Sequence, residues 1–471
     1  MMSLQEAAQV LSATLAGGQH DRPVAGKIDF TGVSTDSRAL ARGDLFVALV
    51  GPNFDGHDFI VQARARGATA ALVQQDRLTG DQEYGIPLIQ VQNTRLALGQ
   101  LAAYWRARFT IPLVAVTGSN GKTTVKEMIA SILKRAAEQA PEGMRTDAPD
   151  AVLATQGNLN NDIGMPLTLL RLREWHHYAV IEMGMNHPGE ISYLSRLAKP
   201  SVALITNAGD AHIQGLGSVE AVARAKGEIF EGLDQQGIAV INADDPHNRL
   251  WRELAGNRQI IDFGLKSKAK VSAGYKLAFS GAQITLILPQ GVEETALQVP
   301  GEHNVRNALA AAAAAVAVGV PPKTIASGLS TFGGVKGRMQ RKCGVRGATL
   351  IDDCYNANPD SVRAALAVLA KAEGKKVLVL GDMGELGEKG REFHEQIGDE
   401  ARIAGIDELM ALGDLSAYAA EKFGIGARHF RKMEDLLADI ETLPGPDVTL
   451  LIKGSRFMQM ERVVKRLEAG L

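Results

Sequence analysis

The feature that most constrains this fold is a series of short apolar runs, each followed by a turn and a helical pattern. LVAVT (113–117), YAVIEM (178–183), SVALIT (201–206) and GIAVIN (237–242) are runs of this kind in the middle of the chain. Apolar runs without polar alternation are typical of parallel strands that are buried on both faces. The sequence therefore predicts an α/β fold with a central parallel sheet that helices cover on both sides.

The strand-then-helix pattern changes along the chain in a way that predicts domains. A chain of 471 residues is expected to form roughly three domains. We predict a small α/β domain over residues 1–92, a central domain over 93–319 and a Rossmann-like domain over 320–471. The second boundary follows an alanine-rich helical pattern that ends at Gly319, with two prolines just beyond. Glycine and proline in these positions are strong signals for the end of a helix.

Both outer domains carry shorter versions of the same pattern. In the first, DLFVAL (44–49) and TAALVQ (69–74) predict strands, and Asp55 is expected to open a helix. In the third, several strand-then-turn units are each followed by a helical pattern, which is typical of a Rossmann-like sheet. These units are TLIDDCY, KVLVLGD, ELMALGD and VTLLIKG.

The charge balance excludes several classes of partner. The chain has 51 Lys and Arg residues against 53 Asp and Glu residues, and no basic block, which argues against a nucleic-acid groove or an anionic membrane surface. Cys343 and Cys354 are the only cysteines, too few for a disulfide framework or a cysteine-based zinc site. The N-terminus does not read as a signal peptide, and the longest apolar stretch, 308–318, is too short to span a bilayer. We expect a cytoplasmic protein with small-molecule partners.

The strongest chemical signal is a glycine-containing loop between a strand and a helix. Its glycines let backbone N–H groups surround phosphate oxygens, and the helix that follows adds its positive dipole end. A lysine here would reach the β- and γ-phosphates, and the next hydroxyl would be a magnesium ligand. Val116 stands where the strict Walker pattern has its first glycine, so the loop is a shortened form. The predicted nucleotide-binding residues are Thr117, Gly118, Ser119, Asn120, Gly121, Lys122, Thr123 and Thr124.

Three further residues follow predicted strands or lie in a nearby helix. Glu182 comes directly after YAVI, and a carboxylate at that strand end can hold Mg²⁺ beside the phosphates. His212 follows ALITN, and Lys226 lies in the helical pattern SVEAVARAKGEIF. Taken alone, each has a structural alternative: a helix cap for Glu182, a satisfied polar residue for His212, a solvated face for Lys226. The phosphate loop by itself fits a kinase, a GTPase, a transporter ATPase or a ligase, although the guanine-reading NKxD motif is absent.

The order of the motifs resembles that of the Mur ligase family, and the resemblance spans nearly the whole chain. The motifs STDSRALARGDLFVAL, DGHDFI and GDMGELG are similar to those of the branch that adds D-Ala-D-Ala. The motifs of the family as a whole are TGSNGKTT, GNLNNDIGMPLTLL, EMGMNHPGEI, TNAGDAHIQGLGSVEAVARAKGEIF, NADD, GEHNVRNALAA, GRMQ and DDCYNANPDS.

The resemblance implies an ATP-dependent ligase of peptidoglycan precursor synthesis. Its expected substrates are UDP-MurNAc-tripeptide and D-Ala-D-Ala, joined through an acyl phosphate with release of ADP and phosphate. It implies Lys122, Glu182, His212 and Lys226 as catalytic residues and two Mg²⁺ ions as cofactors. Thr123, Glu182, His212 and Lys226 would hold the metals, Lys226 as a carbamate formed with CO₂. The lysine must be neutral to attack CO₂, and lysine pKa values fall readily on burial.

The remaining site residues also come from the resemblance. Asn307 resembles the adenine contact, and Arg338 and Asp353 resemble residues that reach the nucleotide from the third domain; Cys354 departs from the serine more usual after the paired aspartates. The substrate positions are less specific, because Asx-turns and helix caps explain each of them about as well. Those positions are Ser34, Asp36, Ser37, Arg38, Asn53 and His57 for the UDP-sugar in the first domain, Asn158, Asn160 and Asn161 in the second, and Asp382, Met383, Glu385, Lys453 and Ser455 in the third.

Two alternatives remain open at this point. One is another ligase of the same type, which adds a single amino acid or resembles folylpolyglutamate synthase, since these enzymes share the phosphate machinery. The other is a non-catalytic, nucleotide-switched binding protein, although a binder needs no second metal site. We also expect a monomer whose third domain closes over ATP. The third residue of the tripeptide, meso-diaminopimelate or L-lysine, is left open.

Overall fold

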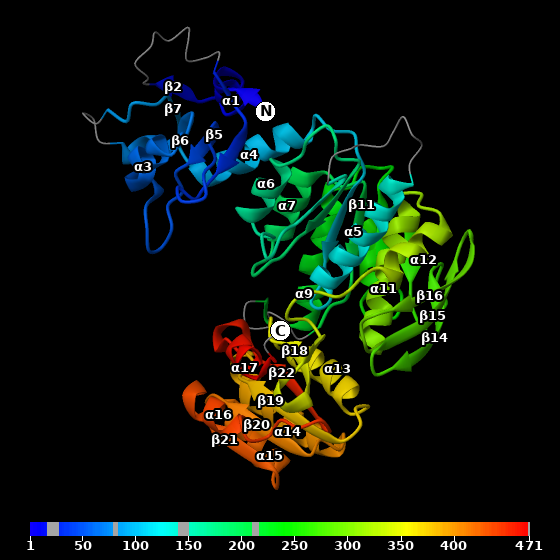
Figure 1. The fold of residues 1–471 in the computed structure, drawn as a ribbon. Coiled ribbons are helices and arrows are strands. Elements are labelled where there is room, and N and C mark those ends of the chain that lie inside the picture. The colour runs from blue at the N-terminus through cyan, green and yellow to red at the C-terminus, as the bar shows by residue number, and fades with distance from the viewer. Residues whose placement is uncertain (17–27, 79–82, 140–149, 210–215, 470–471) are drawn as a thin grey trace.

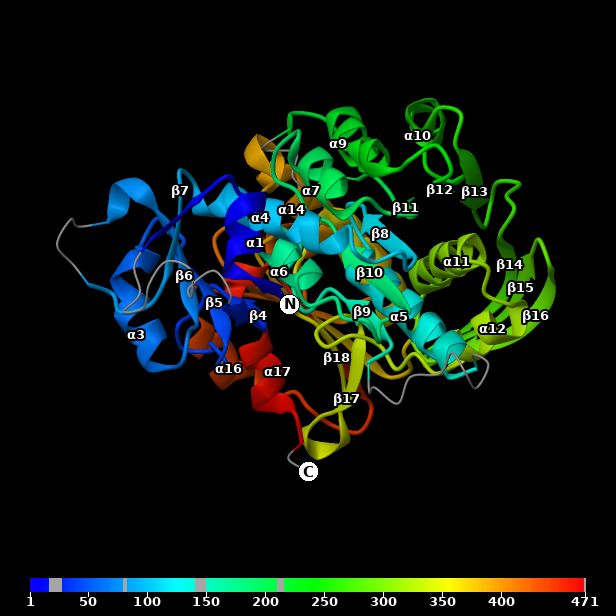
Figure 2. The ribbon, with the colours of Figure 1, turned by 90° about the horizontal axis from the view of Figure 1, so that it is seen from above.

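The computed structural model describes residues 1–16, 28–78, 83–139, 150–209 and 216–469. It has three α/β regions in chain order, and in Figure 1 the N-terminal and C-terminal regions lie at opposite ends of the molecule with the central region between them. Seen from above, helices cover both sides of the central sheet (Figure 2). Among the described residues, no helix is long and apolar enough to cross a membrane. The predicted α/β fold class is confirmed.

The N-terminal sheet has the order β2-β7-β6-β5-β4, in which only β2 runs antiparallel to its neighbour. The strands predicted at 44–49 and 69–74 are confirmed as β5 and β6. Asp55 caps the predicted helix, because its carboxylate accepts a hydrogen bond from His57 N at 3.0 Å. The elements of this region are α1 Leu4–Val10, β2 Thr14–Ala16, β4 Gly32–Ser34, β5 Asp44–Val47, η1 Gly56–Phe59, α3 Ile60–Ala65, β6 Ala70–Gln74 and β7 Leu88–Val91, with β1 Met2–Ser3 paired to β3 Asp29–Phe30.

The central sheet has the order β13-β12-β11-β8-β10-β9 and is parallel throughout. The chain leaves β8 toward one side of the sheet and returns to build the other side, so the end of β8 is a topological switch point, where ligands bind in open α/β sheets. All four predicted strands of this region are confirmed. The strands are β8 Leu113–Thr117, β9 Val152–Ala154, β10 Tyr178–Glu182, β11 Val202–Ile205, β12 Ile238–Asn242 and β13 Gln259–Phe263.

Helices bury both faces of this sheet. Helices α5 and α11 pack together on one face, and their apolar side chains form a core with Val116, Val180 and Leu204. The other face is covered by α4, α6, α7 and α9, whose core is continuous with that of the N-terminal region. The helices are α4 Thr94–Arg106, α5 Lys122–Glu138, α6 Gly164–Leu169, α7 Glu190–Ala198, α9 Val219–Gly227, α10 Asn248–Ala255 and α11 Glu302–Ala317.

A small antiparallel sheet was not predicted. It consists of β14 Ser272–Ala278, β15 Gly281–Leu288 and β16 Gly291–Leu297. Buried and exposed side chains alternate along β15, as expected for a strand with one face on a core. This sheet packs beside α11 and α12 Pro322–Ser330.

The packing of α12 bears on the predicted boundary after residue 319. Ile325, Leu329 and Phe332 lie in the core that α5 and α11 build, and α12 packs directly on α5 and β16. Gly319, with φ of 80°, does end α11 as predicted. Helix α12 therefore packs with the central core, and the domain boundary after residue 319 stays a prediction.

The third region is a six-stranded sheet in the order β17-β18-β22-β19-β20-β21, with β17 alone antiparallel. The four strands predicted here are confirmed as β18, β19, β20 and β22. The elements are β17 Gln340–Cys343, β18 Thr349–Asp353, α13 Pro359–Leu369, β19 Lys375–Gly381, α14 Gly390–Ile403, β20 Glu408–Leu412, α15 Ser416–Phe423, β21 Ala427–Phe430, α16 Met433–Ile440, β22 Val448–Lys453 and α17 Glu461–Leu467.

Candidate functional site

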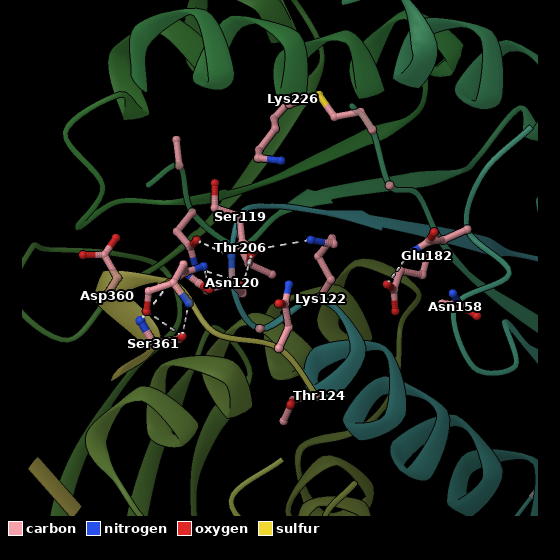
Figure 3. A pocket seen from close by; sticks show the side chains of 18 of the residues that line it. Ser119, Asn120, Lys122, Thr124, Asn158, Glu182, Thr206, Lys226, Asp360 and Ser361 are labelled. Carbon is pink, nitrogen blue, oxygen red and sulfur yellow. Dashed lines mark hydrogen bonds between the residues drawn. The ribbon is translucent and has the colours of Figure 1, made fainter. Parts of the chain in front are cut away.

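A cavity of about 1460 Å³ lies at the carboxyl ends of the central strands, between the central and third regions. Predicted residues from every part of the chain except the N-terminal region line it. Figure 3 shows the part around Lys122, Glu182 and Lys226, with Asp360 and Ser361 of the third region on the opposite side. The predicted residues in its lining are Ser119, Asn120, Gly121, Lys122, Thr124, Asn158, Asn160, Asn161, Glu182, Lys226, Asn307, Arg338, Asp353, Glu385, Lys453 and Ser455.

The loop after β8 requires glycine at two positions. Gly118 has φ of 148°, and a Cβ atom there would lie 1.8 Å from Thr206 Oγ1. Gly121 has φ of 82°, and a Cβ atom there would lie 2.4 Å from Asn307 Oδ1. The absence of side chains therefore lets the loop pass close to its neighbours and turn into α5, whose first residue is Lys122. Backbone N–H groups at such a helix start are donors suited to phosphate.

Lys122 folds back over the loop that precedes it. Its Nζ donates to the carbonyls of Gly118 at 2.6 Å and Ser119 at 3.3 Å. Burial lowers the pKa of Lys122, while the negative charge of Glu182 acts in the opposite direction. The ammonium group is thus already placed beside the loop that would receive the phosphates.

Asn120, at the tip of the loop, connects the central and third regions. Its N–H donates to Asn207 Oδ1 at 2.9 Å, and its carbonyl accepts from Thr206 Oγ1 at 2.6 Å. Its side-chain oxygen accepts from Asn358 Nδ2 at 2.8 Å, and Asn358 also caps α13 through Ser361 N. Thr206, Asn207 and Asn358 were not predicted as site residues, although all three are polar residues at or just beyond the ends of predicted strands.

A second contact between these regions reaches the predicted magnesium ligand of the loop. Arg338 Nη2 donates to Thr123 Oγ1 at 2.9 Å. The guanidinium carbon lies 4.2 Å from the centre of the Tyr355 ring, a distance typical of a cation–π contact. Arg338 therefore contacts the phosphate loop, and its contact with a nucleotide stays a prediction.

Glu182 ends β10 and is 2% exposed. Its Oε1 accepts from Asn160 Nδ2 at 2.7 Å, and its backbone N–H donates to Thr155 Oγ1 at 2.9 Å. Its other oxygen, Oε2, is buried and has no hydrogen-bond partner among the residues that the structure describes. A buried carboxylate oxygen in this state is costly unless a donor or a cation meets it.

Lys226, in α9, is 1% exposed and lines the cavity. Figure 3 shows its amine pointing from α9 toward the phosphate loop. Burial, and to a lesser degree the charge of Lys122, holds the pKa of Lys226 well below the ordinary value of 10.5. A solvated-face role is therefore wrong for this lysine. The predicted ligand His212 lies outside the described residues, and within the described ranges no three His, Cys, Asp or Glu side chains form a group that could hold a metal.

The nucleotide residues predicted beyond the loop are held by internal bonds. Asp353 accepts from Met339 N at 3.1 Å and from Lys453 Nζ at 2.5 Å. Asn307 Nδ2 donates to Asn304 Oδ1 at 3.1 Å. Lys453, predicted to bind substrate, is 2% exposed, and its ammonium group is paired with Asp353.

Cys354, which stands where the family more often has serine, is buried. The side chain is 2% exposed, and its Sγ donates to Ile452 O at 3.5 Å. Burial raises the pKa of the Cys354 thiol far above its usual range. The thiol is thus a packed, neutral group behind the cavity wall.

The residues predicted to bind substrate in the third region differ in whether they line the cavity. Asp382 accepts from the backbone N–H groups of Ser416 at 2.7 Å and Leu415 at 3.2 Å, at the start of α15. Met383 is fully buried. Neither side chain lines the cavity, whereas Ser455, whose Oγ accepts from Gly384 N at 2.8 Å, and Glu385 both do.

The three asparagines of the central region also differ. Asn161 caps the start of α6, because its side-chain oxygen accepts from Gly164 N at 2.9 Å. Asn160 holds Glu182, as described above. Asn158 is exposed and lines the cavity. Of the three, Asn158 is the best placed for a direct contact with a bound molecule.

The N-terminal candidates lie away from this cavity, and several have internal partners. Both ring nitrogens of His57 are engaged, Nδ1 with Asp55 Oδ1 at 2.5 Å and Nε2 with Gln74 N at 2.8 Å. Hydrogen bonds from Arg38 lower the pKa of Asp36 to about 2. The other three candidates are Ser34, whose hydroxyl donates to Asp36 O, Ser37, which donates to Gln62 Oε1, and the exposed Asn53.

The cavity wall nearest the N-terminal region contains residues that were not predicted as site residues. Arg95, in α4, is paired with Asp162, with its Nη2 at 2.6 Å from Oδ1. Tyr193 and Glu190 of α7 lie along the same wall. The cavity is thus lined from helix α4 through the phosphate loop to the third region.

Three family models match successive parts of the chain. The Mur ligase family catalytic domain matches residues 29–106. The Mur ligase middle domain matches residues 116–315. The Mur ligase glutamate ligase domain matches residues 337–456. These matches cover all three regions of the structure.

Individual proteins are similar over the full length. A relative from Escherichia coli (strain K12), named UDP-N-acetylmuramoyl-tripeptide–D-alanyl-D-alanine ligase, is 40% identical over 471 residues, 99% of this chain and 98% of the relative. The crystal structure of MurF from Acinetobacter baumannii has a TM-score of 0.87 at 38% identity, covering 98% of each chain. MurF ligase from Thermotoga maritima in complex with ADP has a TM-score of 0.79 at 28% identity, covering 93% of this chain and 97% of the other.

Proposed function

The chain belongs to the Mur ligase family, and we propose that it joins D-alanyl-D-alanine to UDP-N-acetylmuramoyl-tripeptide in an ATP-dependent step of peptidoglycan precursor synthesis. The observation that carries the proposal is full-length similarity, at 40% identity, to a relative named for that reaction. The cavity supports it, because one space is bordered by a phosphate loop, a buried carboxylate and a buried lysine. A single space of this kind can hold a nucleotide and an acid side by side.

ATP would bind with its phosphates on the loop from Thr117 to Thr124. The T. maritima relative was solved with ADP, and this loop has the required form, with two glycines and a helix start at Lys122. The ammonium of Lys122 would leave the carbonyls of Gly118 and Ser119 for phosphate oxygens. Charge-assisted contacts of that kind are about twice as strong as neutral ones.

The residues present fit a magnesium site. Glu182 offers a buried oxygen that lacks a partner among the described residues, and Thr123 offers a hydroxyl on the loop. Glu182, Thr123 and His212 would hold Mg²⁺, with Lys226 as a further ligand in its carbamate form. The chemistry supplied by bound Mg²⁺ is the neutralisation of charge on the transferred phosphoryl group.

A carbamate on Lys226 is favoured by the burial of its amine. Only a neutral amine attacks CO₂, and the lowered pKa of Lys226 makes that form accessible. The neutral amine forms a new N–C bond as one C–O π bond of CO₂ breaks, and the amine then loses one proton, so an anion replaces the neutral amine. An anion at this position would remove the repulsion that a protonated Lys226 exerts on Lys122.

The reaction proceeds in two steps that use no side-chain nucleophile. An oxygen of the tripeptide carboxylate attacks the γ-phosphorus, the bond to the bridging oxygen breaks, and ADP leaves. The amine of D-Ala-D-Ala then attacks the acyl carbon, loses a proton, and expels phosphate. The side chains around the cavity, Lys122 above all, orient the reactants and offset charge, which is how phosphoryl transfer is generally accelerated.

Closure of the third domain would protect the acyl phosphate from water. Asn358 and Arg338 of that domain touch Asn120 and Thr123 of the loop, which supports an approach to bound nucleotide. We also propose that the protein is a monomer. We place it in the cytoplasm, because ATP and UDP-linked sugars are cytoplasmic metabolites. Light scattering of the purified protein tests the monomer.

Product identification by mass spectrometry tests the proposed function. The protein is incubated with ATP, Mg²⁺, D-Ala-D-Ala and UDP-MurNAc-tripeptide carrying either meso-diaminopimelate or L-lysine. We expect a UDP-MurNAc-pentapeptide, with one ADP and one phosphate for each product. D-Ala alone and single L-amino acids serve as controls. Phosphate release with a single amino acid but not with the dipeptide would overturn the proposal in favour of another ligase of the family.

A further inference from the structure

A chain of buried polar groups leads to Glu182 from the side away from the cavity. Lys126, in α5, is 0% exposed, and its Nζ donates to Thr155 O at 2.5 Å and also bonds Glu127 Oε1. Thr155 is 1% exposed, and its Oγ1 accepts from the backbone N–H of Glu182 at 2.9 Å. Neither Lys126 nor Thr155 lines the cavity. Thr155 therefore contacts Glu182 directly, and Lys126 is connected to Glu182 through Thr155.

The carboxylate of Glu182 is fixed from the other end by Asn160. Asn160 Nδ2 donates to Oε1 at 2.7 Å, and the backbone of Asn160 is itself held, because Gly184 N donates to Asn160 O at 2.8 Å. One carboxylate oxygen is thus bound by an amide and the other is left without a partner among the described residues. The arrangement selects which oxygen remains available.

We infer that Lys126, Thr155 and Asn160 are positioning residues that hold Glu182 with Oε2 available for a divalent cation. The inference rests on the metal site of the proposed function. A buried lysine costs free energy unless its hydrogen bonds are made. Lys126 donates to the carbonyl of Thr155, and the Thr155 hydroxyl accepts from the backbone N–H of Glu182. Partners of this kind behind a metal ligand are worth about 10- to 100-fold in metal affinity.

Threonine at position 155 allows a conservative test. Thr155→Val removes the hydroxyl with almost no change in shape, and Thr155→Ser keeps it. The dissociation constant of a non-hydrolysable ATP analogue is measured by calorimetry in EDTA and again in Mg²⁺. The constant in EDTA divided by the constant in Mg²⁺, the magnesium ratio, gives the contribution of the metal to affinity. We expect Thr155→Val to lower that ratio about tenfold while the affinity in EDTA stays unchanged, and Thr155→Ser to keep the wild-type ratio.

Thr168→Val is the matched control. Thr168 is also 1% exposed, but its hydroxyl donates to Gly164 O within α6 and touches neither Glu182 nor the cavity. Its ratio should equal that of the wild type, so a general effect of removing a buried hydroxyl is excluded. Thermal unfolding of each variant checks that the fold is retained.

Two further variants separate the inference from the proposed function. Glu182→Gln should lower the magnesium ratio at least as much as Thr155→Val; an unchanged ratio would overturn the proposed metal site, and the inference with it. If Glu182→Gln lowers the ratio and Thr155→Val does not, the inference alone is wrong. Asn160→Ala, at a partly exposed residue, decides the question if Thr155→Val fails to fold, and a wild-type ratio there would refute the positioning role.

Discussion

The central sheet and the third sheet both carry polar side chains at the carboxyl ends of their strands, but the two sets are bonded differently. At the central sheet, Glu182 keeps one buried oxygen without a partner among the described residues, and Lys226 is a buried amine with a lowered pKa. At the third sheet, Asp353, Asp382 and Lys453 are engaged in internal hydrogen bonds. Position at a strand end is therefore a weaker indication of a ligand site than a buried polar atom without a partner, such as Glu182 Oε2 among the described residues.

The physical reason is the cost of burial. An unpaired buried polar group lowers the stability of a protein by about 1–3 kcal/mol. Such a group is therefore expected mainly where function requires it. A satisfied group has no such cost and needs no ligand to explain it. We therefore interpret Glu182 and Lys226 as groups that serve the reaction, and Asp382 and Lys453 as groups that serve the fold. Four predictions test this difference.

The largest effect is expected at Lys122 of the central set. Lys122→Ala removes the ammonium that would meet the transferred phosphate, so ADP formation should fall about a thousandfold, the upper range for loss of one well-placed donor. The free energy of unfolding should change little, because the lysine bonds only two carbonyls of its own loop. A coupled assay of ADP release measures the rate, and near-normal turnover would remove the loop from the mechanism.

The next effect is expected at Lys453 and should appear in stability. Lys453→Met leaves the buried carboxylate of Asp353 without its cation, and breaking a buried ion pair from one side costs about 3–5 kcal/mol. Urea unfolding followed by circular dichroism measures the change. A fully stable variant that has lost only its affinity for D-Ala-D-Ala would contradict the structural interpretation of Lys453.

Lys226→Ala should abolish ligation without harming the fold. The loss of a metal ligand should lower turnover by at least about a hundredfold. Because the missing group is a carboxylate in its carbamate form, short carboxylates such as acetate or propionate should restore part of the activity. Chloride at the same ionic strength is the control, and an alanine variant as active as the wild type would exclude the carbamate.

The smallest effect is a gain in stability at the same residue. Lys226→Met fills the same space without a buried amine. The free energy of unfolding at pH 7 should therefore rise by about 0.5–2 kcal/mol, because active-site residues are often kept at a cost in stability. The folded-state pKa lies below the ordinary 10.5, so the unfolded chain binds more protons and the stability of the wild type rises with pH in that window. The advantage of methionine should therefore shrink as pH approaches 10.5, measured by thermal unfolding in CO₂-free buffer.

The sequence predicted the elements that have one dominant signal. Strands such as β8, β10 and β12 are continuous apolar runs, and the phosphate loop was recognised from glycines at two positions where the backbone has positive φ. The β14–β16 sheet was missed, because its alternating pattern is weak beside the stronger helical patterns on either side. The placement of α12 was missed because a helix end at Gly319 says nothing about what the next helix packs on.

Site residues divide in the same way. Lys226 could be named only through family resemblance, because burial is a property of the folded chain and a lysine in a helix is usually exposed. Asp382 and Met383 were grouped with the substrate site, but Asp382 is bonded by the backbone N–H groups of Leu415 and Ser416, and the N–H of Met383 donates to His394 Nε2. These partners come from other parts of the sequence. The roles proposed for Asn158, Glu385 and the N-terminal residues stay predictions, as does that of His212.

The packing of α12 also bears on how the third region would move in the proposed closure. The chain leaves the central core after Phe332 and passes through Gly334 and Gly337, both at positive φ, before it reaches Arg338. Arg338 lies next to these glycines, whereas Phe457 and Glu385 lie farther along the domain. A rotation about these two glycines would move Phe457 and Glu385 farther than Arg338, which is next to Gly337 in the chain and would stay close to Thr123. The nucleotide end of the cavity would thus keep its geometry while the peptide end opens and shuts.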